Sequence, residues 1–378
     1  MNQEQSLPDN KIINDLQLDA IALLKQLIAI PSFSREESKT ADCIETYLHS
    51  KKITASRHHN NVWAINKYFD NKKPTLLLNS HHDTVKPNAG YKLDPFLPIE
   101  KDGKLYGLGS NDAGGCLVSL IAAFLFFYPR KDLGYNLVIA LTAEEEISGS
   151  NGIESLLNNS EFMDSLKPKD ATEALKQLSA IVGEPTRMQM AVSEKGLLVL
   201  DCIAKGKAGH AARDEGENAI YNAFKDIEWI KNYRFSKVSD LLGPVKLSVT
   251  SIETDNKAHN VIPSICKFVV DVRVNELYTF EEIIKIIADN IKSDIKPRSS
   301  RLRSSMIPLD HPLVKAGLFL HLNYYGSPTT SDKALMNFPA LKIGPGDSAR
   351  SHTADEYIFV EEINTGIEMY IQLLKQLL

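Results

Sequence analysis

Cysteine is scarce in this sequence, and the few cysteines present are scattered. Cys43, Cys116, Cys202 and Cys266 are the only four, and no two have Cys-x-x-Cys spacing. We therefore expect neither a cysteine zinc site nor a disulfide framework. Positive charge is not in excess, because 43 Lys and Arg stand against 48 Asp and Glu, a formal net charge of −5. The basic face that nucleic-acid binding requires is not expected.

Long hydrophobic runs are also lacking. The longest apolar stretch, residues 116–128, is interrupted by Ser119 and falls short of the roughly 20 residues that span a bilayer. Residues 1–15 are polar and acidic, unlike a signal peptide. Hydrophobic residues make up 43% and charged residues 24% of the chain, as in globular proteins. We therefore expect a soluble, cytoplasmic protein that does not bind membranes.

The length and the hydrophobic pattern predict two domains. A chain of 378 residues is long enough for about two domains of roughly 100–200 residues each. Continuous apolar runs indicate strands buried on both faces of a parallel sheet, and helical patterns alternate with them. This alternation predicts an α/β domain with helices on both faces of a mostly parallel sheet. The expected strands are 75–79, 136–142, 180–183 and 340–343, and the expected helices are 14–29, 36–51 and 114–128.

Residues 191–295 have a different pattern. The order strand, helix, strand, strand, helix is most of a ferredoxin-like α+β unit. We expect this segment to be a second domain inserted into the first, which would comprise residues 1–190 and 296–378. The expected strands are 197–204, 245–252 and 267–273, and the expected helices are 218–233 and 279–292.

Histidine and acidic residues follow the predicted strands of the first domain. His81 and Asp83 follow the first strand, Glu144–Glu146 the second, and Glu184 the third. Ligands of open α/β sheets bind beyond the carboxyl ends of the strands. Crowded carboxylates repel one another unless a positive charge lies among them. Imidazoles mixed with carboxylates, without thiolates, indicate zinc or another divalent first-row metal.

Two further candidates lie in loops. Asp112 belongs to the glycine-rich segment Gly107–Gly115, and His352 follows the turn Gly344-Pro345-Gly346. Each motif alone has a structural explanation: a hydrogen-bonded histidine, a solvated acidic turn, or a simple loop. The glycine-rich segment lacks the Lys-Ser/Thr ending of a phosphate-binding P-loop. The metal-site prediction depends on all the motifs occurring together.

Five segments together resemble the acetylornithine deacetylase, succinyl-diaminopimelate desuccinylase and aminoacylase family of dinuclear zinc metallohydrolases. They are Ser80–Val85, Gly107–Asp112, Thr142–Glu146, Gly183–Thr186 and Gly344–His352, and they occur in the order of the family. The resemblance implies a zinc-peptidase-like catalytic domain with an inserted lid or dimerisation domain. It also implies two divalent metal ions, zinc first, with cobalt or manganese as alternatives.

The resemblance assigns a role to each matched metal ligand. It implies that His81 and Glu184 bind one ion and that Glu146 and His352 bind the other. Asp112 would bridge the two ions. His82 occupies the variable position inside the His-x-Asp motif and is left as a competing ligand.

Five other residues are assigned through the same resemblance. Asp83 would orient the imidazole of the first histidine ligand. Glu145 would remain off the metals as general base, the alternatives being a third ligand or a spacer. His210 of the inserted domain would reach the active site of a partner subunit and hold the oxyanion, unless it is a surface histidine. Asn260 and Arg273 would bind substrate, although Arg273 fits a surface ion pair nearly as well.

The ending of the chain is similar to that of the N-acyl-ornithine or N-acyl-citrulline deacylases of arginine biosynthesis. We therefore expect hydrolysis of the amide bond of an N-acetyl- or N-succinyl-L-amino acid, most simply ornithine or citrulline. The enzymatic alternatives are a di- or tripeptidase and a succinyl-diaminopimelate desuccinylase with the same metal site. The non-enzymatic alternative is an inactive binding homologue. We expect the protein to bind a small-molecule N-acyl amino acid and to form a homodimer through the inserted domain.

Overall fold

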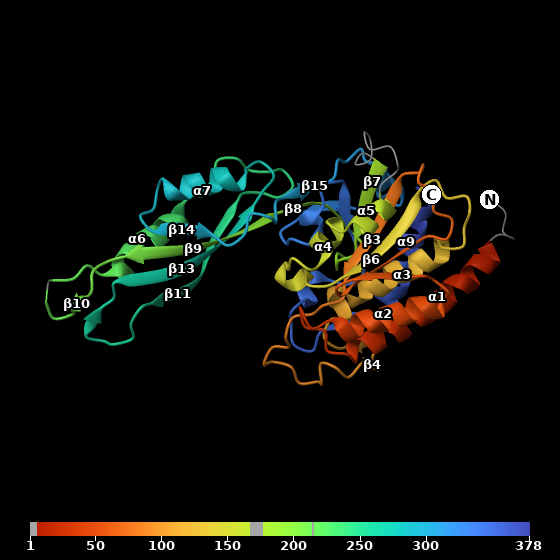
Figure 1. The fold of residues 1–378 in the computed structure, drawn as a ribbon, viewed down its shortest axis with the longest axis horizontal. Helices are drawn as coiled ribbons and strands as arrows, with labels where there is room; N and C mark the ends of the chain where they lie inside the picture. The colour runs from red at the N-terminus through yellow and green to blue at the C-terminus, as the bar shows by residue number, and fades with distance from the viewer. Residues whose placement is uncertain (1–5, 167–176, 214) are drawn as a thin grey trace. The chain divides into compact units, whose positions relative to one another are not determined.

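The computed structural model describes residues 6–166, 177–213 and 215–378. The chain divides into two compact units (Figure 1). The first comprises Met1–Val192, Ile307–Tyr325 and Ser331–Leu378, and the second comprises Ser193–Met306 and Gly326–Thr330. The second unit thus extends past residue 295, where we predicted its end.

A mixed, largely parallel sheet forms the centre of the first unit. β3 is parallel to both of its neighbours, β6 and β7, and β17 is parallel to β7. Every residue of β3, β6 and β7 is buried, which explains why the middle of each strand is rich in apolar residues. In spatial order the strands are β1 (Ser56–His58), β2 (Asn61–Ile65), β6 (Asn136–Thr142), β3 (Thr75–His81), β7 (Leu178–Val182), β17 (Ala340–Lys342) and β8 (Met190–Glu194).

Helices cover both faces of this sheet, as predicted. On one face α3 packs against β3 and lies against α1 and α9. On the other face Phe162 and Leu166 of α5 join a core with Trp63 and Leu77 of the sheet. The helices of this unit are α1 (Ser6–Ile28), α2 (Ser38–Ser50), α3 (Gly115–Phe127), α4 (Ile153–Leu157), α5 (Ser160–Leu166), α8 (Pro312–Phe319) and α9 (Val360–Lys375).

α3 is apolar on all sides because it is enclosed. With the turn before it, Ser110–Phe127 forms an 18-residue segment that is long and apolar enough to cross a membrane. Within the chain, however, 89% of this segment is buried. A helix that is hydrophobic all round is typical of the core of a large protein as well as of a membrane span, and here it lies in the core.

The second unit has the predicted ferredoxin-like order. Its sheet has the order β11-β13-β9-β14 with antiparallel neighbours. Alternate residues of β9 and β13 are buried, and Leu198, Phe268 and Ile283 belong to the core beneath the helices. In chain order the elements are β9 (Gly196–Lys205), α6 (Ala219–Asn232), β11 (Lys246–Thr254), β13 (Ile265–Val274), α7 (Phe280–Ala288) and β14 (Asp294–Pro297).

Short elements and helix ends account for most differences from the predicted pattern. α1 begins at Ser6, eight residues before the predicted start at residue 14, and Pro8 falls in its first turn, where proline is tolerated. A ribbon of two strands, β10 (Gly209–His210) and β12 (Val261–Ile262), was not predicted. The remaining strands are β4 (Ile99–Lys101), β5 (Lys104–Tyr106), β15 (Ser305–Met306), β16 (Tyr324–Ser327) and β18 (Tyr357–Phe359).

Candidate metal centre

The parallel strands bring the predicted residues to one edge of the sheet. In the register of β3 and β6, His81 lies opposite Thr142, two residues before Glu144. In the register of β3 and β7, Asn79 lies opposite Val182, two residues before Glu184. Side chains that follow neighbouring parallel strands meet at their carboxyl ends.

Two groups of potential ligand atoms share one carboxylate. In the first group, His81 Nε2 lies 3.4 Å from Asp112 Oδ1 and 3.7 Å from Glu184 Oε1. In the second, His352 Nε2 lies 3.7 Å from Asp112 Oδ2 and 2.8 Å from Glu146 Oε2. The two oxygens of Asp112 therefore face different histidines, as a bridging carboxylate requires.

The environment of these atoms fits divalent cations. His81 is 1% exposed, and its buried Nε2 has no hydrogen-bond partner among the described residues. Burial raises the pKa of Glu145 well above its ordinary value, and the charge of Glu184 raises it further. Burial alone would lower the pKa of His81, but the neighbouring carboxylates of Asp112 and Asp83 raise it well above its ordinary value. Imidazole nitrogens and carboxylate oxygens without sulfur form a suitable donor set for zinc and similar ions.

Asp83 connects the first histidine to the acidic turn. Its carboxylate accepts hydrogen bonds from the backbone N–H groups of Glu145 at 3.0 Å and Glu146 at 3.1 Å, and from Ser34 Oγ at 2.7 Å. His81 Nδ1 lies 3.4 Å from Asp83 Oδ1 and 3.1 Å from the carbonyl oxygen of Asp83. Asp83 thus lies beside Nδ1 of His81, and it also accepts hydrogen bonds from the turn that follows β6.

The three consecutive glutamates make different contacts. Glu144 has a φ of 56°, and its carboxylate accepts a hydrogen bond from Asn151 Nδ2 at 2.9 Å. Glu146 contacts His352, as described above. Glu145 Oε2 lies 3.9 Å from His81 Nε2, and Glu145 belongs to neither ligand group. Glu145 is therefore beside the candidate metal centre without being part of it.

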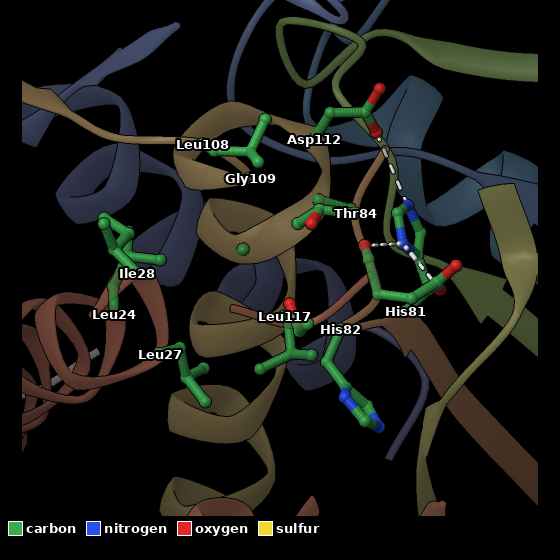
Figure 2. A pocket seen from close by; sticks show the side chains of 14 residues that line it. Leu24, Leu27, Ile28, His81, His82, Thr84, Leu108, Gly109, Asp112 and Leu117 are labelled. Atoms are coloured by element: carbon green, nitrogen blue, oxygen red, sulfur yellow. Dashed lines mark hydrogen bonds and ion pairs between the residues drawn. The ribbon is translucent and has the colours of Figure 1, made fainter. Parts of the chain in front are cut away.

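His82 is not placed as a competing ligand. Its Nδ1 lies 2.9 Å from Thr40 Oγ1 and its Nε2 lies 2.9 Å from the carbonyl oxygen of Asn60. Figure 2 shows its ring directed away from His81 and Asp112. Burial lowers the pKa of His82 to about 4. Both ring nitrogens are therefore engaged in a neutral, structural role.

A small cavity adjoins the site between α1 and α3 (Figure 2). Leu27 and Leu117 form part of its apolar wall, and Thr84, His81 and Asp112 add polar atoms. Its volume is about 20 Å³, which is room for roughly one water molecule. The buried Oγ1 of Thr84 has no hydrogen-bond partner among the described residues. The cavity is too small for an amino-acid substrate.

The structure brings together two of the three predicted residues of the second unit. His210 pairs with Val261 across the β10–β12 ribbon, and the N–H of Ala211 donates to the carbonyl of Asn260 at 3.0 Å. His210 and Asn260 are both exposed. Arg273 lies near the opposite end of β13 and bonds Asp271 through its Nε at 2.9 Å. This contact is the surface ion pair that we left as the alternative for Arg273.

Two buried carboxylates near the site were not assigned a role from the sequence. Glu356 accepts hydrogen bonds from the loop that carries Asp112. Asp332 accepts a hydrogen bond from Thr142 Oγ1 at 2.9 Å. Asp332 begins a short helical turn, and Glu356 follows Asp355 in a loop. Neither periodicity nor spacing in one sequence distinguishes such residues from surface charges.

Sequence comparison identifies relatives over most of the chain. Residues 77–376 match the model of peptidase family M20/M25/M40. The succinyl-diaminopimelate desuccinylase of Wolbachia pipientis subsp. Culex pipiens is 26% identical over 385 residues, covering 95% of this chain and 94% of that protein. The desuccinylase of Cereibacter sphaeroides is 27% identical over 281 residues, 71% of each chain.

Solved structures share the fold at lower identity. The M20 family metallo-carboxypeptidase Sso-CP2 from Sulfolobus solfataricus has a TM-score of 0.74 at 17% identity, covering 95% of this chain and 98% of its own. A Staphylococcus aureus tripeptidase has a TM-score of 0.74 at 18% identity with the same coverage. The Bacillus subtilis YXEP protein, described as a dinuclear metal binding peptidase, has a TM-score of 0.69 at 15% identity, covering 96% and 98%.

The comparisons confirm the predicted fold class and the predicted kind of enzyme, a metal-dependent hydrolase of amide bonds. The two sequence relatives are named desuccinylases, whereas the ending of the chain pointed to ornithine deacylases. Because the family model matches residues 77–376, the chain belongs to the M20/M25/M40 peptidase family.

Proposed function

We propose that this enzyme removes an acyl group from the α-nitrogen of an L-amino acid by metal-dependent amide hydrolysis. The observation that carries the proposal is the position of Asp112 between the two ligand groups, with Glu145 beside them but in neither. His81, Asp112 and Glu184 would hold one ion, and Asp112, Glu146 and His352 the other. The description of the Bacillus subtilis relative as a dinuclear metal binding peptidase supports two ions.

Different groups of the protein would have different roles in hydrolysis. Divalent ions bound here would supply Lewis-acid charge that polarises the scissile carbonyl and makes water more acidic. Glu145 would take a proton from the attacking water and deliver it to the leaving amine. Asp83 would keep this base in place, because it holds the backbone N–H groups of Glu145 and Glu146. Zinc is the expected ion, with cobalt and manganese as alternatives.

The second unit would contribute to substrate binding and dimerisation. His210 and Asn260 lie on one exposed ribbon, from which His210 would reach an oxyanion in a partner subunit. On α6, Tyr221 is 68% exposed and Phe224 is 65% exposed, and a second copy of the chain is the proposed partner of this face. Mixing inactive His210→Ala and Glu145→Gln proteins should restore activity if the site is shared between subunits, and an absence of rescue would exclude sharing.

The substrate is tested with chelated protein to which zinc, cobalt or manganese is added. The panel consists of N-acetylornithine, N-succinylornithine, N-acetylcitrulline, N-succinyl-diaminopimelate and several dipeptides. We expect an N-acyl amino acid to be the best substrate, with either ornithine, citrulline or diaminopimelate as its amino-acid part. A preference for dipeptides above about tenfold, or about 1.4 kcal/mol in the barrier, would identify a peptidase instead. No turnover with any metal would indicate an inactive binding homologue.

The role of Glu145 is tested by the Glu145→Gln substitution. We expect kcat to fall by at least about 10²-fold, the low end for general acid–base catalysis, while elemental analysis still finds two metal ions. Glu161→Gln is the control, because Glu161 is an exposed glutamate on α5 and its substitution removes the same charge. Loss of a metal ion together with activity would show that Glu145 is a ligand.

A further inference from the structure

Glu356 is a buried carboxylate that belongs to neither ligand group. It is 2% exposed and lies in the loop between His352 and β18. Its Oε2 accepts a hydrogen bond from the N–H of Gly109 at 3.1 Å. Its Oε1 accepts from the N–H groups of Asn111 and Asp112, both at 2.9 Å. One side chain therefore holds three backbone groups of a single loop.

The loop that carries Asp112 makes hydrogen bonds at two further points. The carbonyl of Glu356 accepts a hydrogen bond from the N–H of Gly107 at 3.0 Å. The side chain of Asn111 donates to the carbonyl of Asp347 and accepts from its N–H, both at 3.0 Å. The loop is also closely packed, because a Cβ on Gly109 would lie 2.6 Å from Thr84 Cγ2. The position of Asp112 is thus determined by the segment that leads to β18.

Three backbone N–H groups partly offset the cost of burying Glu356, although burial and the charge of Asp112 still raise its pKa to about 8. A buried carboxylate is costly unless hydrogen bonds or a cation compensate its charge. Three converging N–H groups form the kind of anion-binding concavity that stabilises such a charge. Both side-chain oxygens of Glu356 are engaged with these backbone N–H groups. Its contacts are directed at the backbone that carries Asp112 rather than at the ligand atoms.

We propose that Glu356 is a positioning residue that orients Asp112 so that each carboxylate oxygen faces one ligand group. The Asp112 side chain leaves the backbone beside the N–H that Glu356 holds, so loosening that N–H would misalign both oxygens together. This inference rests on the proposed dinuclear function. It predicts that one residue outside the centre controls both ion sites at once, whereas Glu184 and Glu146 each serve one.

The test is zinc titration of chelated protein by calorimetry, which does not depend on turnover. Glu356→Gln keeps the shape of the side chain but replaces one acceptor oxygen by an NH₂ donor. We expect both zinc affinities to fall by about 10- to 100-fold, the usual effect of losing a partner that orients a ligand. Glu184→Gln and Glu146→Gln should each weaken one site more than the other.

Asp355→Asn is the matched control. Asp355 is the neighbouring carboxylate, and it accepts hydrogen bonds from the N–H groups of Lys92 and Leu93 rather than from the Asp112 loop. We expect this variant to retain both zinc affinities. Unchanged affinities in Glu356→Gln, or an effect of the same size in Asp355→Asn, would overturn the inference. Failure of the unmodified protein to bind two ions would instead refute the proposed function.

A second measurement keeps the inference testable if Glu356→Gln does not fold. Glu356→Asp retains the carboxyl group but shortens the side chain by one methylene, so it cannot reach all three N–H groups without movement. We expect weaker zinc binding at both sites and faster amide hydrogen exchange of residues 109–112 in the chelated protein. Exchange and affinities equal to those of the unmodified protein would refute a positioning role.

Discussion

Asp332 should make the stability of the protein depend on pH in a defined direction. It lies in the turn Asp332–Leu335 and is 5% exposed. Burial raises its pKa from the ordinary value of 3.8 to about 6, although the hydrogen bond from Thr142 opposes the shift. Between these two pH values the folded chain retains a proton that the unfolded chain releases. The contribution of Asp332 to the free energy of unfolding must therefore fall as pH rises from about 4 to about 6.

The size of this effect follows from the two pKa values. A difference of about 2 pH units at about 1.4 kcal/mol each gives about 3 kcal/mol as an upper limit. Asp332→Asn removes the ionisable group and keeps an oxygen that can accept the hydrogen bond from Thr142. We expect this variant to be more stable than the unmodified chain at pH 7–8 by up to about 3 kcal/mol, and equally stable near pH 4.

Urea denaturation of chelated protein at a series of pH values between 4 and 8 measures this difference directly. Asp310→Asn, which alters an exposed carboxylate, serves as the control and should show no such trend. If the advantage of Asp332→Asn were constant across the series, a change in packing rather than in ionisation would be responsible. If the variant were less stable at pH 8, the buried charge would be a net stabilising feature and the reasoning would be wrong.

Three other predictions concern folding and metal binding. Phe162 is fully buried, with its ring centroid 5.6 Å from that of Trp63. Phe162→Ala should therefore lower the free energy of unfolding, measured by urea denaturation, by about 3–5 kcal/mol. A change near zero would contradict this packing. Thr279→Ala removes the capping box of α7 and should lower the free energy of unfolding by about 1 kcal/mol. An unchanged midpoint of urea denaturation would contradict this. Zinc added to chelated protein should raise the melting temperature, because the ions bind only the folded ligand groups; calcium should raise it far less.

The sequence predicted the centre of the fold better than its periphery. β3, β6 and β7 were found because burial on both faces makes them continuous apolar runs. The residues after these strands could then be placed at one sheet edge by topology alone. β4, β5 and β18 have three residues each, too few to show a period. α9 was not predicted, although Ile363, Ile367 and Tyr370 line its buried side.

The candidate site shows a similar division. Residues at strand ends and in recognisable motifs were placed together, whereas the buried carboxylates Glu356 and Asp332 were not assigned a role. Glu356 meets Gly109 and Asp112 across nearly 250 residues of chain, and no local pattern reports such a contact. For Arg273 the sequence left substrate binding and a surface ion pair as alternatives, and the structure shows a contact with Asp271. Long-range hydrogen bonds are the information that a single sequence does not contain.

The arrangement of ligands along the chain has a consequence for biosynthesis. His81, Asp112 and Glu184 all precede the second unit, whereas His352 follows it. Because proteins are made from the amino terminus, the residues of the first ion site leave the ribosome together and early. The second candidate ligand group can be completed only after the second unit has also been synthesised. Because Glu356 also holds the loop that carries Asp112, the whole candidate centre can take its final form only when translation is nearly complete.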